Sequence, residues 1–438
     1  MIKIDDLATL LPDYAARQRW FAGADVEGLE VIAHEVLRDE WPGLVWVLFR
    51  VGGVTYQELV GLRPLEQTER FLEGKGRSYL GDIDTDAGTA LAYSALVDPE
   101  LALLVAGVVA PGEEFARARP LTVEQSNTSV VFDERLIMKL YRRVADGPNP
   151  DVEVTEALGR VGFQHVAAPV AVWRRDECDL AVVIPYLEGG TEGWQLALTS
   201  LRDIYDSRLE PAESGGDIGP EMRRLGQVTA ELHLALADAL GVEPGNPTRW
   251  ADDLQSAVQQ SSGFDIDRVE EVYDALRSVG DPGQAIRIHG DFHLGQVLRT
   301  DYGWYILDFE GEPLVPLEDR RHRSSPLRDV AGMLRSFHYA SEAARIERHE
   351  ALGDEDQQQL FALAAKWEAH ASTAFLEGYL GAEGIGVLLP TAQGDLRALL
   401  DAFVLGKAVY EVSYERDHRP DWVRIPLGAI ERVLAGAD

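Results

Sequence analysis

The chain has 438 residues, which is too long for one ordinary core, so two or three domains are expected. With 41 Lys and Arg against 74 Asp and Glu, its formal net charge is −33, and such an acidic surface disfavours nucleic-acid or membrane partners. Its single cysteine excludes an intrachain disulfide. The start lacks a signal-peptide pattern, and the longest apolar run, 101–110, is too short to span a bilayer. We therefore expect a cytoplasmic protein.

The first hundred residues combine helical and strand patterns. Apolar spacing predicts a helix over 1–19. Strand-like segments at 29–37, 45–51 and 55–62 are joined by Pro-Gly and Gly-Gly turns, which indicates an antiparallel meander. The stretch 85–105 is predicted to be helical.

A strand, strand, helix, strand, strand order follows. Two β runs within 121–141 flank Asp133-Glu134 and indicate a hairpin, although the turn lacks glycine. Asn149 is a predicted N-cap, with Pro150 opening a helix over 150–161. The second strand pair is expected within 168–187.

From about residue 191 the pattern is mainly helical. Period-3.6 apolar spacing predicts helices near 220–240, 266–278, 326–345, 355–380 and 395–415. We divide the chain into a segment 1–90, a segment 91–190 and a helical segment 191–438, which together make an α+β protein.

Two strand-turn motifs interrupt the predicted helices. The first reads I-R-I-H-G-D-F-H-L-G-Q-V-L (286–298) and the second Y-I-L-D-F-E-G-E-P (305–313). Asp291, Gln296 and Asp308 supply hard oxygen ligands of the kind that Mg²⁺ prefers. Asp291 followed by Gln296 parallels the kinase catalytic loop, and Asp308 stands where kinases carry a metal-binding Asp. We predict that Asp291 orients a substrate hydroxyl and that Gln296 and Asp308 bind Mg²⁺. An isolated Asp after a strand would otherwise be a turn former.

A nucleotide site is predicted upstream of these motifs. Lys139 in a strand is placed to reach ATP phosphates and Glu153 to pair with it; alternatively the two are a surface lysine and a helix-dipole residue. The polar stretch around Asn127 takes the place of a glycine-rich loop, or is an ordinary polar turn. The predicted nucleotide contacts are Ser126, Asn127, Thr128, Ser129, Lys139, Glu153 and, at a hinge, Ile184 and Tyr186.

Several longer stretches resemble the actinobacterial maltokinase family. They are E-Q-S-N-T-S-V-V-F, L-I-M-K-L-Y-R-R, H-G-D-F-H-L-G-Q-V-L, L-D-F-E-G-E-P and S-P-L-R-D-V-A-G-M-L-R-S-F, with R-W-F-A-G near the start and R-P-D-W-V-R-I-P near the end. The resemblance implies a bilobal fold like that of eukaryotic-type kinases and aminoglycoside phosphotransferases, with an N-terminal cap. It also implies Asp291 as catalytic base and Gln296 and Asp308 as Mg²⁺ ligands.

The wider family includes glucosamine kinases, and two departures bear on the substrate. Val404 and Gly406 stand where the maltokinase pattern has acidic residues, and Ala24 follows the R-W-F-A-G motif where a basic region is expected. An acidic pocket suits an ammonium-bearing sugar. The candidate substrate residues are His289, Asp291, His293, Glu310, Glu312, Tyr410, Glu411, Tyr414 and Trp422; helix and tail packing is the alternative for the last four.

These observations predict an ATP- and Mg²⁺-dependent sugar kinase. Glucosamine, giving the 6-phosphate, is the favoured substrate, and maltose, giving the 1-phosphate, is the alternative. An aminoglycoside phosphotransferase and a nucleotide-binding pseudokinase are two further readings. We expect a monomer or homodimer.

Overall fold

The computed structural model describes residues 4–21, 26–65, 72–86, 88–121, 127–258, 261–312, 315, 317–349 and 354–436. The chain divides into two compact units. The first comprises Met1–Glu153 and Ala167–Glu188, and the second comprises Val154–Val166 and Gly189–Asp438. The three-part division stays a prediction, and its boundary between residues 90 and 91 falls inside a strand.

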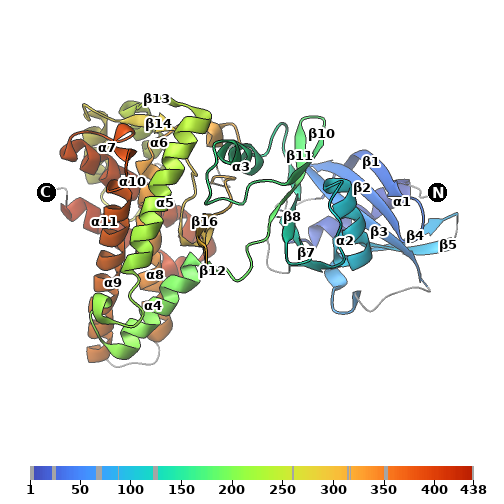
Figure 1. Ribbon diagram of the computed structural model, residues 1–438, viewed down its shortest axis with the longest axis horizontal. Coiled ribbons are helices and arrows are strands. Elements are labelled where there is room, and N and C mark those ends of the chain that lie inside the picture. The colour runs from blue at the N-terminus through green and yellow to red at the C-terminus, as the bar shows by residue number, and fades with distance from the viewer. Residues whose placement is uncertain are drawn as a thin grey trace. The chain divides into compact units, whose positions relative to one another are not determined.

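The described part of the first unit contains a six-stranded antiparallel sheet of order β1-β2-β3-β5-β4, with β9 added beside β3 (Figure 1). Its strands are β1 (Glu30–Arg38), β2 (Gly43–Val51), β3 (Val54–Pro64), β4 (Tyr79–Thr85), β5 (Gly88–Ser94) and β9 (Arg143–Val144). The predicted meander is confirmed, because β1 pairs with β2 and β2 with β3.

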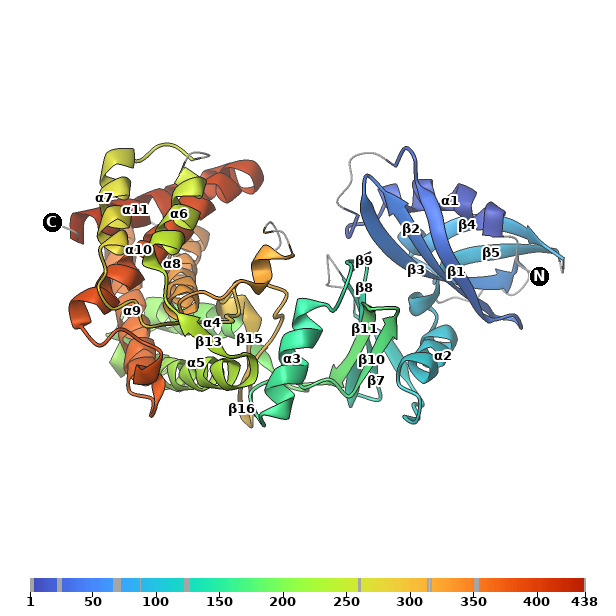
Figure 2. The same ribbon diagram turned by 90° about the horizontal axis from the view of Figure 1, so that it is seen from above.

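Both faces of this sheet are buried. Along β2, Trp46 faces a core shared with helix α2 (Pro99–Val109), while Val45 and Val47 face a core shared with α1 (Ile4–Ala16) (Figure 2). This two-sided burial explains why β2 is apolar almost throughout. The helix predicted over 85–105 is partly wrong: β5 pairs with β3, and α2 begins only after its N-cap Asp98.

The described residues also form a five-stranded sheet of order β10-β11-β8-β7-β6. Its strands are β6 (Ala118–Pro120), β7 (Asn127–Phe132), β8 (Leu136–Tyr141), β10 (Ala171–Arg175) and β11 (Cys178–Pro185). The predicted β7–β8 hairpin and β10–β11 pair are confirmed. Helix α3 (Pro150–Arg160) starts where predicted, since the Asn149 side chain accepts a hydrogen bond from the Asp151 N–H at 2.8 Å.

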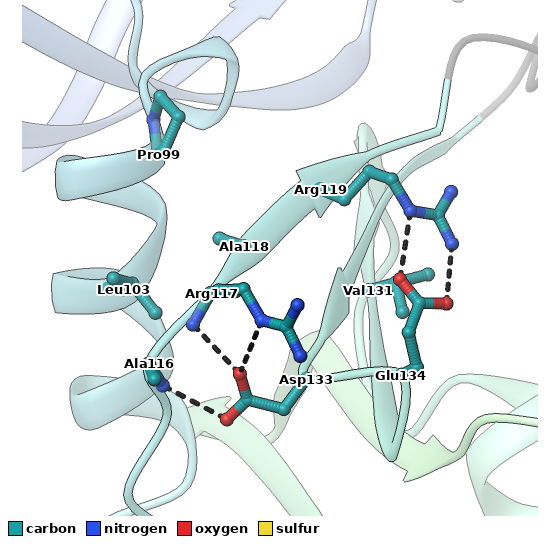
Figure 3. Close-up of a pocket in the computed structure, with 9 residues that line it drawn as sticks. All are labelled: Pro99, Leu103, Ala116, Arg117, Ala118, Arg119, Val131, Asp133 and Glu134. Carbon is teal, nitrogen blue, oxygen red and sulfur yellow. Dashed lines mark hydrogen bonds and ion pairs between the residues drawn. The ribbon is translucent and has the colours of Figure 1, made fainter.

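The β7–β8 turn forms without glycine because residues outside the turn bind its two acidic side chains. Asp133 and Glu134 both have positive φ, 52° and 54°, a conformation that Asp tolerates better than most residues. The Asp133 carboxylate accepts backbone hydrogen bonds from Ala116 and Arg117, and Arg119 binds Glu134 through two nitrogens (Figure 3). These residues line a surface cavity, and its charged groups pair with one another and fix the hairpin.

The second unit is mainly helical, and its long helices form the body of the unit (Figure 1). They are α4 (Gly193–Ser207), α5 (Gly219–Leu240), α6 (Pro247–Val258), α7 (Ile266–Arg277), α8 (Leu327–His349), α9 (Asp354–Leu380), α10 (Gln393–His418) and α11 (Arg424–Gly436). The five predicted helices are confirmed. Helices α5 and α9 approach closely at Gly226 and Gly378; a Cβ on Gly226 would lie 2.0 Å from the Phe375 carbonyl oxygen.

Short strands carry the turn motifs of this unit. Among the described residues, β15 (Val297–Thr300) pairs with β12 (Thr191–Glu192) and β16 (Gly303–Ile306), and β13 (Val242–Pro244) pairs with β14 (Gln284–Ile286). No helix in the described ranges has the length and apolar character to cross a bilayer. The cytoplasmic location and the oligomeric state stay predictions.

Candidate active site

The His289–Asp291 turn follows β14, and a buried carboxylate binds its backbone. Asp329, on the first turn of α8, accepts hydrogen bonds from the backbone N–H groups of His289 at 2.8 Å and Gly290 at 2.9 Å. Gly290 has φ 87°, which suits glycine. Because one carboxylate clamps two consecutive amides, the backbone that carries Asp291 is fixed.

Asp329 belongs to a buried group that we call the support: His233, Asp329 and Tyr379. His233 Nε2 lies 3.2 Å from the Asp329 carboxylate, and its Nδ1 lies 2.9 Å from the Tyr379 hydroxyl. Burial alone would raise the pKa of Asp329, but the hydrogen bond and charge of His233 outweigh burial and lower it. The carboxylate therefore stays ionised and keeps accepting from the turn.

His289 links the two turn motifs. Its Nε2–H donates to the Leu307 carbonyl oxygen at 2.9 Å, its Nδ1 accepts from the Asp291 N–H at 3.4 Å, and its ring packs on Phe309 at 4.8 Å. The residue is only 2% exposed. Since both ring nitrogens are engaged within the protein, positioning of the turn fits His289 better than the predicted substrate contact.

The Asp291 carboxylate borders a cavity. The side chains of Lys407 and His293 flank this carboxylate. Lys407 Nζ is 3.3 Å from its Oδ1, and His293 Nε2 is 3.6 Å from its Oδ2. Burial would raise the pKa of Asp291, but its interactions with His293 and with the Lys407 charge together hold it below its usual value. Asp291 is thus an ionised acceptor at neutral pH.

Gln296 and Asp308 converge, as a shared metal site would require. Gln296 ends the short helix Leu294–Gln296, its carbonyl oxygen accepts from the Leu307 N–H at 2.9 Å, and its side-chain amide lies 3.3 Å from an Asp308 oxygen. Asp308 has φ 64°, an unusual conformation for a non-glycine residue.

The chemistry of this pair fits Mg²⁺, because both side chains carry a hard oxygen donor and rotation of the amide exchanges its nitrogen for its oxygen. Within the described residues no group of three His, Cys, Asp or Glu side chains is arranged to hold a metal. A cation here would therefore take its remaining ligands from phosphate and water. Binding of Mg²⁺ stays a prediction.

A cavity of about 210 Å³ opens beside Asp291, with walls from α6, α8 and α10. Glu312 and Tyr410 line it, as does Lys407, whose Nζ lies 3.0 Å from Glu312 and over the Tyr410 ring at 5.1 Å. Burial and the charge of Glu312 raise the pKa of Tyr410 above its ordinary value, so its hydroxyl stays protonated. Three predicted substrate residues, Asp291, Glu312 and Tyr410, thus share one cavity.

The other predicted substrate residues have different surroundings. Glu411 is buried and accepts from Arg335 on α8 at 2.6 and 3.0 Å, so it is engaged in packing α8 on α10. Tyr414 stacks on His418 at 4.4 Å. Trp422 lies beneath Arg419 at 4.7 Å. The Glu310 carbonyl oxygen accepts from Arg320 at 3.2 Å.

The predicted nucleotide residues lie in the first unit. Lys139 Nζ is 3.6 Å from Asp151, in the first turn of α3, two residues before the expected partner Glu153; the Glu153 pairing stays a prediction. The Thr128 hydroxyl accepts from Arg142 at 2.7 Å, so its hydrogen remains available to donate.

The remaining nucleotide residues follow the second sheet. Asn127 and Ser129 lie on β7, with Ser129 buried and opposite Lys139 in register. Ser126 lies outside the described residues. Ile184 packs beside Val182, and the Tyr186 N–H donates to the Arg135 carbonyl at 2.8 Å.

Sequence reasoning missed Asp329, His233, Lys407 and the α6 residues Trp250 and Asp253. Two of them stand in motifs already visible in the chain: Asp329 in S-P-L-R-D-V-A-G and Lys407 in F-V-L-G-K-A-V-Y-E. The ionisable residue inside each motif was the signal from which Asp329 and Lys407 could have been identified as site residues. His233 lies mid-helix in α5 and carries no comparable one.

Comparison with known proteins gives the family of the chain. The family model described as "Phosphotransferase enzyme family" matches residues 117–357, more than half of the chain. A glucosamine kinase of Streptacidiphilus jiangxiensis is 30% identical over 72% of this chain and 74% of its own. One of Mycolicibacterium smegmatis is 28% identical over 72% of this chain and 79% of its own.

Solved structures show the same fold. A glucosamine kinase structure covers 98% of this chain and 99% of its own, with a TM-score of 0.69 and 22% identity. A second, in complex with glucosamine, ADP and inorganic phosphate, has a TM-score of 0.66 at the same coverage and identity. The predicted α+β, bilobal kinase-like fold is confirmed. The chain belongs to the phosphotransferase enzyme family.

Proposed function

We propose that this phosphotransferase is an ATP-dependent glucosamine kinase that forms glucosamine 6-phosphate. The observation that carries the proposal is the ionised Asp291, which is clamped on a rigid turn and faces a cavity beside Lys407. The two relatives named glucosamine kinase support this choice of sugar. So does the cavity, whose carboxylates suit a cationic substrate.

Asp291 is placed to orient and deprotonate the acceptor. Its carboxylate accepts the proton of the sugar hydroxyl, and the hydroxyl oxygen bonds to the γ-phosphorus of ATP. The bond from that phosphorus to the bridging oxygen breaks, and ADP leaves with the electron pair. A low pKa makes Asp291 a weak base, which suits a loose transition state in which the proton leaves late.

The candidate partners of Mg²⁺ belong to the second unit, and the candidate partners of the nucleotide belong to the first. Gln296 and Asp308 would hold the cation, which when bound neutralises charge on the phosphate oxygens. Lys139, Asn127 and Thr128 would donate to the phosphates, and Ile184 and Tyr186 would meet the base. Lys407 holds its ammonium group beside Asp291, where it stabilises the negative charge of the reacting groups.

Turnover of a sugar panel tests the proposal. The purified chain is incubated with ATP, Mg²⁺ and glucosamine, maltose, glucose or kanamycin, and ADP release is followed. We expect glucosamine to have the highest kcat/KM, and NMR of the product should place phosphate on the C6 oxygen. A higher kcat/KM for maltose, with phosphate on C1, would overturn the proposal in favour of a maltokinase. Preference for kanamycin would indicate an aminoglycoside phosphotransferase.

A further inference from the structure

The α6 wall of the active-site cavity carries a carboxylate with no hydrogen bond in the described part of the chain. Four described carboxylates line this cavity: Asp253, Asp291, Glu312 and Asp329. Asp291 and Glu312 share Lys407, and Asp329 accepts from the turn backbone. The ion pair of Asp253 is with Arg249, at 3.9 Å, beyond hydrogen-bonding distance. Asp253 therefore keeps its acceptor capacity.

Electrostatics agree with this geometry. Burial raises the pKa of Asp253 more than the charges of Arg249 and Arg328 lower it. The Asp253 side chain is 60% exposed, so water rather than a close cation solvates this carboxylate. A cationic ligand group in the cavity would replace part of that water beside the carboxylate.

The shape of an amino sugar requires a carboxylate on a wall of the cavity away from Asp291. In a glucopyranose ring, the carbon that bears the 6-hydroxymethyl group and the carbon that bears the 2-amino group stand across the ring from each other. With the 6-hydroxyl at Asp291, the ammonium group points away from it. Lys407 lies at Asp291 and Glu312 and would repel a second cation there. The ammonium group must therefore meet another wall of the cavity.

Gly406 on α10 leaves room for a side chain of α6 beside that wall. A Cβ at position 406 would lie 2.3 Å from the Cδ2 atom of Leu254, so a larger residue would displace the Leu254 side chain. Leu254 is the neighbour of Asp253, and Trp250 on the same helix is buried against Phe403. Position 406 is also one of the two at which the chain departs from the acidic maltokinase pattern.

We propose that Asp253 binds the amino group of the sugar and sets the preference for an amino sugar over its hydroxyl analogue. This proposal rests on the proposed function and adds the residue that discriminates. Gly406 acts on this wall indirectly, because it makes room for Leu254, the neighbour of Asp253 on α6.

The test compares glucosamine with glucose in wild type and in Asp253→Asn, using the full chain. We expect the ratio of kcat/KM values, glucosamine over glucose, to fall about ten- to a hundredfold, the usual range for losing a charged hydrogen bond. The loss should appear in glucosamine KM, with glucose unchanged. If glucose turns over too slowly, its inhibition constant against glucosamine replaces its kcat/KM.

Asp252→Asn is the matched control. Asp252 is the adjacent residue on α6, but its carboxylate pairs with Arg277 at 2.9 Å outside the cavity. The ratio of kcat/KM values, glucosamine over glucose, should therefore be the same in Asp252→Asn as in wild type. An unchanged ratio in a folded Asp253→Asn variant would overturn this proposal while leaving glucosamine kinase activity intact. Absence of glucosamine turnover in wild type would instead overturn the proposed function. Should Asp253→Asn fail to fold, Asp253→Ser provides the same comparison.

Discussion

The support of the catalytic turn and the open side of the site use polar and ionisable side chains in opposite ways. In the support, His233, Asp329 and Tyr379 are buried and satisfy one another and the turn backbone. We define the open side as Asp291, Gln296, Asp308 and Lys407. Asp291 and Lys407 line the cavity, and the side chains of all four residues are only partly buried.

This difference separates two kinds of effect. A closed hydrogen-bond network fixes geometry, so its loss should appear in the stability of the fold. Charges beside a cavity act on whatever enters, so their loss should appear in turnover with the fold intact. Asp291 and Asp329 are the clearest pair, since the Asp291 side chain is 19% exposed at the cavity, whereas Asp329 is 1% exposed and accepts from the turn backbone.

Of the substitutions at Asp308, Asp329 and Lys407, the one at Asp308, on the open side, is expected to have the largest effect. Asp308→Asn keeps the size of the side chain but removes the charge that would hold a divalent cation. We expect kcat to fall by about a thousandfold, as several kcal/mol of charge stabilisation are lost, while the melting temperature stays unchanged. Steady-state kinetics over a Mg²⁺ series measures this. Asp301→Asn, in the exposed β15–β16 turn, is the control; equal rates in both variants would contradict the metal assignment.

In the support, Asp329→Asn should act first on stability. The substitution weakens the clamp on two backbone amides and leaves buried groups poorly paired, at a cost of about 3 kcal/mol in the free energy of unfolding. Because the folded pKa of Asp329 is lowered, its contribution is present at neutral pH and is lost as pH falls below about 4. Urea unfolding at pH 7 and at lower pH checks both points. Equal stability of the two proteins at pH 7 would contradict the clamp.

A smaller effect is expected from Lys407→Met. Removing this cation raises the pKa of Asp291, since the lysine charge helps to lower it, so the acid limb of the kcat/KM profile should move to higher pH. We also expect kcat to fall about tenfold. Lys366→Met, which removes a surface lysine paired with Glu210, is the control. An unshifted acid limb would show that Lys407 does not act on Asp291.

Patterns in the sequence predicted the features that depend on interactions between residues close in the chain. The β7–β8 hairpin, the Asn149 cap and the convergence of Gln296 with Asp308 all depend on residues close in sequence, and each is present. Helix α11 was missed because Pro426 and Gly428 disfavour helix by propensity. Pro426 falls in the first turn, where a missing N–H costs little.

Long-range partners could not be predicted in this way. Asp329 lies 39 residues from the Gly290 amide that it accepts from, and Lys407 lies 116 residues from Asp291. The spacing of residues along the chain does not predict that α8 and α10 bring these groups to one turn. Likewise, Glu411 matched the expected acidic pocket by type, but the fold turns it towards Arg335.

The most direct test of the central claim is the turnover of glucosamine by Asp291→Asn at saturating ATP and Mg²⁺, with nucleotide affinity measured on the same sample by calorimetry. Asparagine keeps the size of the side chain and its place on the clamped turn but cannot accept the hydroxyl proton. We predict that turnover falls at least about a thousandfold, while ATP affinity and melting temperature match those of wild type. Turnover at the wild-type rate would show that Asp291 is not the base, and the account of this site would be wrong.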